Sequence, residues 1–401
     1  MTLLAAKGRL AEFICQRTDG ILMAAERCLD NGTGCCFIVD GGQRLVGRIS
    51  LDDIRAAIVD GRALLDGALD RLLTERGPAT AGTVGEHDTV VPIVDDDGRL
   101  VDVVVDHSRA FVQVARPDLS RHEFRAVLDG FLSSWISSKG TYIDRFERDF
   151  ARYIGMNHAV ACSNGTVALH LALVALGVGP GDEVIVPDLT FAATINAVLY
   201  CGATPVIVDV GAVSWTMSLN SVAAACTART KAIIPVHLYG RPAEIAPIAD
   251  FAKARRIWIV EDCAEAHGAR YDGRPVGQFS DVSCFSFYAN KIVTTGEGGM
   301  CLTNSPELAA AMQQLRSHGM TPDRAYWHDR VGFNFRMTNL QAAIGHSQLS
   351  RIGETLRRNE RLDRMYRKAL DGISGVSFPP ALPAWYFEPS LYGAHIAEAP
   401  Q

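Results

Sequence analysis

From residue 117 onward, short apolar runs alternate with longer stretches in which apolar residues recur at helical spacing. The runs "EVIVP" (183–187) and "IWIVED" (257–262) are typical of strands buried on both faces, and "TVALHLALVALG" (166–177) and "EIAPIADFAKARR" (244–256) predict helices. Apolar strands separated by amphipathic helices predict a mostly parallel sheet with helices on both faces. We therefore expect an α/β fold in this part of the chain.

The first part of the chain shows a different pattern. The stretch "CFIVDGGQRLVGRISLDDIRAAIVDG" (36–61) predicts a strand, a Gly-Gly turn, a second strand and a helix capped around Ser50. A weaker copy follows in "TVVPIVDDDGRLVDVVVD" (89–106), which again predicts strand, Asp-Gly turn and strand. Two similar units so close together indicate an internal duplication. We therefore expect a small α+β domain over residues 1–116.

Composition and charge narrow the classes of protein. The 401 residues are 48% hydrophobic and 21% charged, which is ordinary for a chain with one or more large cores. The net charge is -6 and no lysine or arginine tract stands out, which argues against a nucleic-acid partner. Because there is no run of about 18 apolar residues, we expect no membrane insertion. The ten cysteines are scattered without a CxxC pair, so we expect reduced thiols in a cytoplasmic protein and no zinc site.

Parallel sheets bind ligands at the carboxyl ends of their strands, so polar residues at those ends are candidates for function. The turn "SNGT" (163–166) lies between a predicted strand and a predicted helix, where glycine and the free N–H groups of the helix could seat a phosphate. A simple helix cap is the alternative. Phe191 follows the strand 183–187 and could lie flat on a planar ring, with a core phenylalanine as the alternative.

Three charged side chains interrupt apolar runs. Glu261 and Asp262 end the strand "IWIVED". Since buried carboxylates are costly unless paired, we expect either a cationic partner or a solvated loop there. Lys291 lies within the β-prone run "SFYANKIVTTGEGGM" (286–300). It either reaches solvent at a strand end or is held at a site where its amine attacks a carbonyl.

One ligand would satisfy all of these features. It needs an anionic group for the SNGT turn, an aromatic ring for Phe191, a protonated ring nitrogen for Asp262 and an aldehyde for Lys291. Pyridoxal 5'-phosphate (PLP) has all four, and a lysine Schiff base with an aspartate on the pyridinium nitrogen is its usual arrangement in proteins. The sequence therefore predicts a PLP enzyme.

Residues 117–378 resemble the DegT/DnrJ/EryC1/StrS family of PLP-dependent nucleotide-sugar aminotransferases. The resemblance rests on six ordered blocks: "SNGTVALHLAL", "GPGDEVIVPDLTFAATINAV", "PVHLYG", "VEDCAEAHGA", "CFSFYANKIVTTGEGGM" and "GFNFRMTNLQAAIG". It implies a type I PLP aminotransferase fold and a homodimer with active sites at the subunit interface. Residues 379–401 form a short tail rich in Pro and Ala where the family usually builds a small C-terminal domain, and we interpret this tail as a truncated or frame-shifted end.

The family's functional residues correspond to positions of this sequence. By resemblance, Lys291 would be the Schiff-base lysine, Asp262 the partner of the pyridine nitrogen, and Phe191 the residue stacked on the ring. The phosphate would be held by residues of three further blocks, one of them from the neighbouring subunit: Gly165, Thr166, Ser286 and, across the interface, Asn334.

Three other positions are candidates for the site: Glu265 as a cofactor-binding residue, and His267 and Arg336, which each have an alternative interpretation. Glu265 lies where many relatives carry a glutamine near the phenolic oxygen of the cofactor. His267 is either near the cofactor or an ordinary core or exposed histidine. Arg336 is either a contact for the nucleotide diphosphate, which arginine can bind in bidentate fashion, or part of a structural ion pair.

The N-terminal domain resembles a pair of CBS modules. Residues 47–53 ("GRISLDD") fit that family's pattern of glycine, apolar residue, Ser/Thr and Asp. In the family, the positions of Ser50 and Asp53 contact the ribose and phosphate of adenosine nucleotides. The second copy, "VDVVVDHSR", lacks the Ser/Thr step. Nucleotide sensing and a structural or oligomerising role are therefore both open.

The resemblance also implies a reaction, in which an amino group moves from L-glutamate to the keto group of a nucleotide-linked deoxysugar. The block 286–300 looks most like members that aminate C4 of GDP-4-keto-6-deoxymannose to make perosamine for polysaccharides such as O-antigen. UDP- and dTDP-sugar relatives share nearly all of its residues. Two alternatives remain: another type I PLP reaction on an amino acid, and a truncated, inactive homologue that senses nucleotides or binds partners through its CBS-like module.

Overall fold

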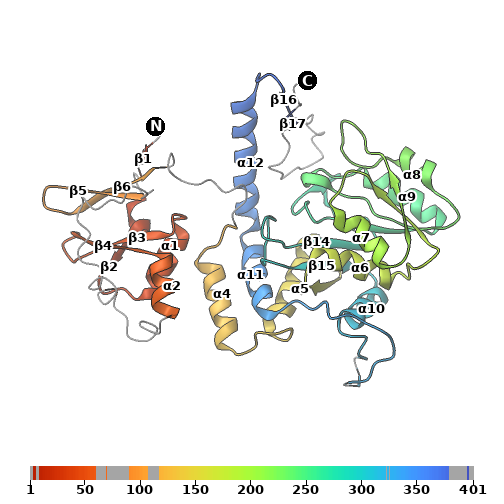
Figure 1. Ribbon diagram of the computed structural model, residues 1–401, viewed down its shortest axis with the longest axis horizontal. Helices are drawn as coiled ribbons and strands as arrows, with labels where there is room; N and C mark the ends of the chain where they lie inside the picture. The colour runs from red at the N-terminus through yellow and green to blue at the C-terminus, as the bar shows by residue number, and fades with distance from the viewer. Residues whose placement is uncertain are drawn as a thin grey trace. The chain divides into compact units, whose positions relative to one another are not determined.

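The computed structural model describes residues 3–5, 9–59, 69, 90–106, 117–321, 323–324, 326–378 and 395–396 (Figure 1). The chain forms two compact units, Met1–Arg125 and Ala126–Gln401. Helix α4 (Arg121–Leu132) begins in the first unit. The limits predicted for the domains, at residues 116 and 378, stay predictions, and most of the predicted tail lies outside the described residues.

The described part of the first unit contains two three-stranded sheets. One has the order β2-β3-β4 (Ile14–Gln16, Cys35–Val39, Leu45–Ser50), and the other has the order β1-β6-β5 (Leu3–Ala5, Leu100–Asp106, Val90–Val94). A 3-10 helix, η1 (Leu10–Phe13), precedes β2, and helices α1 (Ile21–Asp30) and α2 (Leu51–Val59) follow β2 and β4. The predicted order of strand, turn, strand and helix is thus confirmed as far as the structure describes it.

The two hairpins β3-β4 and β5-β6 have the same turn. Asp40 and Asp95 each accept, through Oδ1, hydrogen bonds from the backbone N–H groups two and four residues further along the chain. Each hairpin also shifts register close to its turn, and an antiparallel bridge joins Arg44 of one turn to Arg99 of the other. The same local chemistry at the same place in both copies supports the predicted internal duplication.

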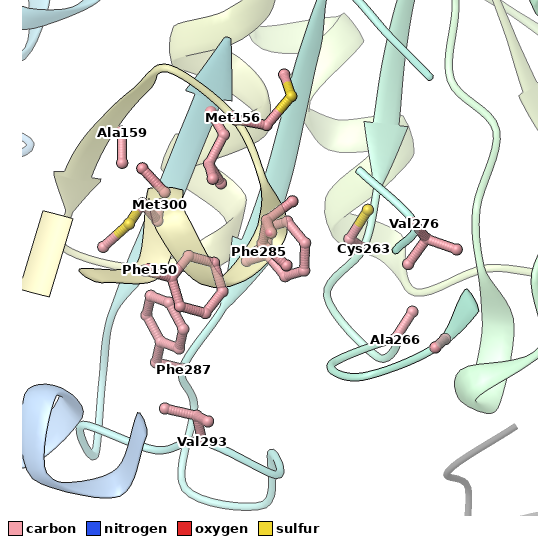
Figure 2. Close-up of a cluster of buried hydrophobic side chains, with 14 of the residues drawn as sticks. Phe150, Met156, Ala159, Cys263, Ala266, Val276, Phe285, Phe287, Val293 and Met300 are labelled. Carbon is pink, nitrogen blue, oxygen red and sulfur yellow. The ribbon is translucent and has the colours of Figure 1, made fainter. Parts of the chain in front are cut away.

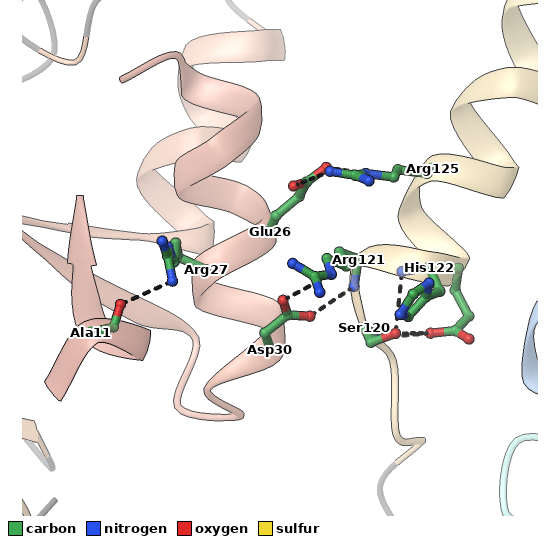
Figure 3. A network of polar contacts seen from close by, with 9 residues as sticks. Ala11, Glu26, Arg27, Asp30, Ser120, Arg121, His122 and Arg125 are labelled. Carbon is green, nitrogen blue, oxygen red and sulfur yellow. Dashed lines mark hydrogen bonds and ion pairs between the residues drawn. The ribbon is translucent and has the colours of Figure 1, made fainter. Parts of the chain in front are cut away.

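The start of α4 packs on α1 within the first unit (Figure 3). Arg125 makes a bidentate ion pair with Glu26, through Nε–Oε1 (2.5 Å) and Nη2–Oε2 (2.7 Å) contacts. Arg121 pairs with Asp30 at 3.4 Å, and the ring of Phe124 packs against the core beneath α1. The first turn of α4 is therefore part of the first unit's own structure.

The second unit is built on a seven-stranded sheet. Its order is β7-β15-β14-β11-β10-β8-β9 (His158–Cys162, Gly299–Thr303, Val282–Ser286, Trp258–Asp262, Thr230–Ile233, Glu183–Pro187, Thr204–Val208). Strand β15 is antiparallel to both β14 and β7, and the other pairings are parallel. The predicted mostly parallel sheet is confirmed, with one reversed strand.

Helices cover both faces of this sheet. The described helices of this unit after α4 are α5 (Thr141–Ile154), α6 (Gly165–Ala175), α7 (Ala192–Tyr200), α8 (Leu219–Ala225), η2 (Leu238–Gly240), α9 (Ile245–Arg255), α10 (Pro306–Arg316), α11 (Asn339–Ser350) and α12 (Ile352–Leu370). Two short ladders complete the unit: β12-β13 (Arg270–Tyr271, Arg274–Pro275) and β16-β17 (Val376–Ser377, His395–Ile396). Among the described helices, none combines the length and apolar composition that crossing a membrane requires.

The core of the second unit consists of two clusters of buried side chains, one on each face of the seven-stranded sheet. Successive residues of β14 alternate between them, so that Cys284 belongs to the cluster beneath α6 and Phe285 to the cluster beneath α5. In the second cluster the Phe150 ring meets the rings of Phe285 and Phe287 edge to face, at centroid distances of 5.0 and 5.2 Å (Figure 2). This aromatic packing fixes the strand that leads to Lys291.

Strand β7 lies at one end of the seven-stranded order, and side chains cover its free edge. The backbone N–H of Ala161 donates to Glu147 Oε1 (2.7 Å), and Arg316 Nη1 donates to the Ala161 carbonyl (2.5 Å). Arg316 also pairs with Glu147 at 2.7 Å. The two outward-facing backbone groups of Ala161, which no neighbouring strand pairs, are thereby satisfied.

Candidate active site

The predicted site residues gather at one edge of the seven-stranded sheet. Strands β7, β8, β11 and β14 run in the same direction, so their carboxyl ends meet there. The SNGT turn follows β7, Phe191 follows β8, and Asp262 and Ser286 are the last residues of β11 and β14. Lys291 lies in the loop that joins β14 to β15. Residues far apart in the sequence thus share one edge, as the predicted fold requires.

Helix α6 begins directly after the turn that follows β7. The Asn164 side chain accepts a hydrogen bond from the Val167 N–H (3.0 Å), so the helix-cap interpretation of SNGT holds. A Cβ at position 165 would lie 2.7 Å from the Cβ of Ser286, so only glycine allows this close approach. The first N–H groups of the helix, at Gly165 and Thr166, have no acceptor within it and carry partial positive charge. Together with the Ser286 hydroxyl, these N–H groups could hold an anion.

Asp262 is buried at the end of β11. Its Oδ2 accepts a hydrogen bond from the Thr194 hydroxyl (2.8 Å), and its Oδ1 accepts one from the Ala264 N–H (3.1 Å). Burial nevertheless raises the pKa of the Asp262 carboxyl, because the charged form loses its hydration. No ion pair of this carboxylate occurs among the described residues, so a cationic group of a ligand could pair with it.

Glu261, one residue earlier, points to the other face of the sheet and is fully satisfied by protein groups. The Ala243 N–H donates to Nδ1 of His237 (3.0 Å), so the proton sits on Nε2, which donates to Glu261 (2.9 Å). Three further donors bond to the same carboxylate: Gly277 N–H, Phe279 N–H and the Ser280 hydroxyl. Ligand atoms of His237, Glu261 and Cys263 lie within 4.8 Å of one another, but both ring nitrogens of His237 are already in hydrogen bonds. This cluster is a structural network.

Lys291 is mostly withdrawn from solvent, with 15% of its side chain exposed. Its Nζ lies 3.2 Å from Glu265 Oε1, and Glu265 Oε2 accepts a hydrogen bond from the Tyr239 N–H (3.1 Å). The alternative of a lysine that extends into solvent is therefore wrong. Tyr239 has left-handed backbone angles (φ 52, ψ 32), a strained conformation for a bulky residue that aims its N–H at Glu265.

Phe191 and His267 have opposite environments. The Phe191 side chain is 74% exposed at the start of α7, so the alternative of a core phenylalanine is wrong. His267 is buried, and its ring packs on Phe150, Phe285 and Phe287 at centroid distances of 6.3, 5.5 and 5.6 Å. Its Nε2 has no hydrogen-bond partner among the described residues. Burial and the nearby Lys291 ammonium lower the pKa of His267 to about 3, so it is a neutral core residue.

Asn334 and Arg336 lie on a segment that runs beside the end of β7. The Ser163 N–H donates to the Phe335 carbonyl (2.8 Å), which ties this segment to the SNGT turn. Arg336 donates from Nε to Asn334 Oδ1 (3.2 Å) and from Nη2 to His318 Nε2 (3.2 Å). The guanidinium is thus held by an amide oxygen and an imidazole nitrogen, and the donors of the Asn334 NH2 group take no part in this contact. The reach of Asn334 into a neighbouring subunit stays a prediction.

In the first unit, Ser50 and Asp53 bond to each other. The Ser50 hydroxyl and N–H both donate to Asp53 Oδ2 (2.7 and 2.9 Å), and the Asp53 N–H donates to Ser50 Oγ (3.2 Å). This reciprocal arrangement is a capping box for α2. It favours the structural interpretation of both residues, because a nucleotide would have to compete with these hydrogen bonds.

No local sequence pattern marks two residues that contact the predicted site residues. Thr194 contacts Asp262 from α7, and Tyr239 contacts Glu265 from η2. Both lie within blocks that the resemblance used, so the blocks were the available signal. The side-chain partners, however, follow only from the folded arrangement.

The residues at this edge fit PLP. A possible anion site, a buried carboxylate that has no cationic partner among the described residues, an exposed aromatic ring and a mostly buried lysine match the phosphate, ring nitrogen, ring face and aldehyde of that molecule. The sheet and its carboxyl edge define the class, a type I PLP-dependent aminotransferase. The chain belongs to the DegT/DnrJ/EryC1/StrS aminotransferase family, whose sequence pattern matches residues 117–386, and the pattern of the CBS domain matches residues 12–60.

Similar proteins agree with this assignment. The GDP-perosamine synthase of Caulobacter vibrioides is 52% identical over 259 residues, 65% of this chain and 70% of the relative. That of Escherichia coli O157:H7 is 46% identical over 266 residues, 66% of this chain and 73% of the relative. The crystal structure of the aminotransferase TlmJ from Streptoalloteichus hindustanus is 35% identical and has a TM-score of 0.67, covering 70% of this chain and 77% of that one. The predicted PLP-dependent sugar aminotransferase is thus confirmed.

Proposed function

We propose that this enzyme transfers an amino group from L-glutamate to C4 of GDP-4-keto-6-deoxymannose and so makes GDP-perosamine for polysaccharide synthesis. The 52% identity to a GDP-perosamine synthase carries the proposal. The ion pair between Lys291 and Glu265 supports an amino-group transfer, because it holds the amine of Lys291 beside a carboxylate at the carboxyl edge of the sheet, where ligands bind.

Bound PLP would supply the carbonyl that takes up the amino group and a ring that accepts electrons. In this proposal Lys291 Nζ moves the α-proton of the amino donor, and Glu265 holds the Lys291 ammonium whenever the lysine is free. Asp262 keeps a proton on the ring nitrogen. The phosphate and the ring face are held by four residues: Gly165, Thr166, Ser286 and Phe191.

We further propose a homodimer in which Asn334 of the partner subunit completes the phosphate site. The free NH2 group of the Asn334 side chain supports this, because Arg336 already occupies the oxygen. Arg336 is the proposed contact for the nucleotide diphosphate. No carboxylate neutralises it in the described part of the chain, so its charge remains available to a phosphate.

The direct test is turnover by the purified full chain with PLP and L-glutamate. GDP-, UDP- and dTDP-4-keto-6-deoxysugars are offered separately, and mass spectrometry follows the replacement of the keto oxygen by an amine. The GDP-sugar should react fastest, and Lys291→Ala should be inactive on all three. Preferential turnover of another nucleotide would refute the proposed sugar, and turnover of a free keto acid alone would indicate an aminotransferase of amino acids.

Adenosine-nucleotide binding by the first unit is the second candidate, and the match to the CBS domain over residues 12–60 favours it. Isothermal titration with AMP and ATP tests it on the full chain, with Lys291→Ala as the control that leaves the first unit intact. Binding that survives Lys291→Ala but is lost in Asp53→Asn would support a nucleotide site at Ser50 and Asp53. Absence of binding in the wild type would leave these residues the capping role.

A further inference from the structure

We infer that Thr194 is a positioning residue for Asp262: its hydroxyl, backed by the hydroxyl of Thr190, holds the carboxylate in the orientation and the ionised form that a protonated ring nitrogen needs. The inference rests on the proposed function, in which Asp262 is the partner of that nitrogen.

The geometry fixes the carboxylate on both sides. The Thr194 side chain is fully buried and its Oγ1 lies 2.8 Å from Asp262 Oδ2, while the Ala264 N–H bonds to Oδ1 at 3.1 Å. Each oxygen therefore has one protein donor, and the plane of the carboxylate is set. An ionised carboxylate oxygen can accept more than one hydrogen bond, so a further donor can still bind.

The two threonines form a chain with a defined direction. Thr190 Oγ1 and Thr194 Oγ1 are 2.8 Å apart, and each hydroxyl has a single proton. An ionised carboxylate only accepts, so Thr194 donates to Asp262 and Thr190 must donate to Thr194. Hydrogen bonds in such a chain polarise one another, which strengthens the one that reaches the carboxylate.

The charge on Asp262 depends on the hydrogen bonds that run from Thr190 through Thr194 to its carboxylate. Burial raises the pKa of the Asp262 carboxyl, and the hydrogen bond from Thr194 is the largest of the effects that lower it again. Without that bond, more of the buried carboxyl would be protonated, and a protonated carboxyl cannot hold a proton on the ring nitrogen. Thr190 is also the neighbour of Phe191, so the chain starts at the loop that carries the exposed ring.

The experiment compares four variants of the full chain. Thr194→Val removes the hydroxyl with little change in shape, Thr194→Ser keeps it, and Thr190→Val removes the second hydroxyl. Thr303→Val is the matched control, because Thr303 is also buried and its hydroxyl also makes a hydrogen bond, to the Asp281 carbonyl (2.7 Å). Thr303 pairs with His158 at the start of β7, which is the opposite edge of the sheet.

The readouts separate positioning from stability. The nitrogen chemical shift of PLP labelled with 15N in the ring reports the ring proton, and titration of the apoprotein gives the dissociation constant of PLP. We expect Thr194→Val to shift the 15N signal toward the unprotonated form and to weaken PLP binding roughly 10- to 100-fold, the loss expected for one hydrogen bond to a charged group. The kcat of the half-reaction with L-glutamate should fall while its KM changes little. Thr194→Ser should restore all three, and Thr303→Val should match the wild type.

A double-mutant cycle tests whether Thr190 acts through Thr194. Thr190→Val alone should move the 15N signal in the same direction by less, and should add nothing in the Thr194→Val background, because its effect passes through Thr194. Additive effects of the two substitutions would show that Thr190 does not act through Thr194. A wild-type 15N signal in Thr194→Val would overturn the inference while leaving the proposed function intact. A wild-type chain that binds no PLP would overturn both. If Thr194→Val does not fold, Thr190→Val decides by whether it moves the signal.

Discussion

Asp262 and His267 are buried titratable side chains near Lys291, and burial shifts their pKa values in opposite directions. The pKa of the Asp262 carboxyl is raised because its charged form loses hydration. The pKa of His267 is lowered to about 3 because its charged form would be desolvated beside the Lys291 ammonium. Each shift links the stability of the apoprotein to pH, and the two links have opposite signs.

Asp262→Asn should make the apoprotein more stable at neutral pH. The native state binds the Asp262 proton more tightly than the unfolded state, so this residue's contribution is full below about the ordinary pKa of 3.8 and is lost as pH rises through the raised value. Each unit of elevation corresponds to about 1.4 kcal/mol at neutral pH. In urea unfolding, the free energy of unfolding of Asp262→Asn should exceed that of the wild type at pH 7, and the difference should shrink at pH 4. The variant should also lose the absorbance of bound PLP. Equal effects at both pH values would contradict the burial argument.

His267 should make the apoprotein sensitive to acid. The unfolded state takes up the proton near pH 6.5 and the folded state only near pH 3, so stability falls as pH drops through that window. His267→Met removes the titration and keeps a flexible apolar side chain against the three phenyl rings. The free energy of unfolding of the wild type should fall more steeply than that of the variant, by about 1.4 kcal/mol per pH unit. Parallel curves from urea titrations across this range would show that His267 does not titrate as proposed.

The sequence located some of these residues and not others, for a physical reason. Asp262 ends an apolar run and Lys291 lies within one, and that pattern is visible locally, whereas Ser286 followed only from the family resemblance. Thr194 and Tyr239 act on partners 68 and 26 residues away, so no local pattern marks them. The interpretation of Lys291 needed the fold as well, since only packing shows that it faces Glu265 and not solvent.

At the scale of the element, strands and helices followed from periodicity closely. Strand β8 has the predicted bounds, β11 begins one residue late, and α6 begins at Gly165 and ends at Ala175 where residues 166–177 were predicted. The reversed direction of β15 was not predicted, because an apolar run reads the same in either direction. Residues 287–298, which join β14 to β15, contain no helix of the kind that usually forms a parallel crossover, and β15 returns antiparallel to β14.

The contact between α6 and β14 makes position 165 intolerant of any side chain. In Gly165→Ala the new Cβ would lie 2.7 Å from the Ser286 Cβ and 3.3 Å from its Cα, so backbone has to move. We expect a loss of about 1–3 kcal/mol in stability and weaker PLP binding, since the anion seat opens. Gly353→Ala in α12 is the control, because its nearest neighbour would be the end of the flexible Arg357 side chain at 3.5 Å. It should be neutral or slightly stabilising in urea unfolding. Normal PLP affinity in Gly165→Ala would argue against this seat.

At the scale of the whole molecule, the chain holds two units with separate cores. The sequence placed the change of pattern near residue 116, whereas the compact units divide at Arg125, because Arg121, Phe124 and Arg125 at the start of α4 pack on α1 (Figure 3). A change in hydrophobic pattern marks where one kind of element gives way to another. It cannot show that the first turn of α4 packs on the first unit, because those contacts are made with Glu26 and Asp30, which are far away in the sequence.

Separate cores predict separate responses to matched mutations. Ile38 in the first unit and Ile185 in the second are both fully buried, and Ile→Val at such sites costs about 0.5–1.5 kcal/mol. By calorimetry, Ile38→Val should lower the midpoint of one transition and leave PLP binding unchanged, because PLP is held by residues of the second unit. Ile185→Val should lower the other transition, by less for the same energy because that unit is larger. Added PLP should raise only this second transition, since a ligand stabilises the unit that binds it. A single transition that shifts with both variants and with PLP would mean that the two units unfold together.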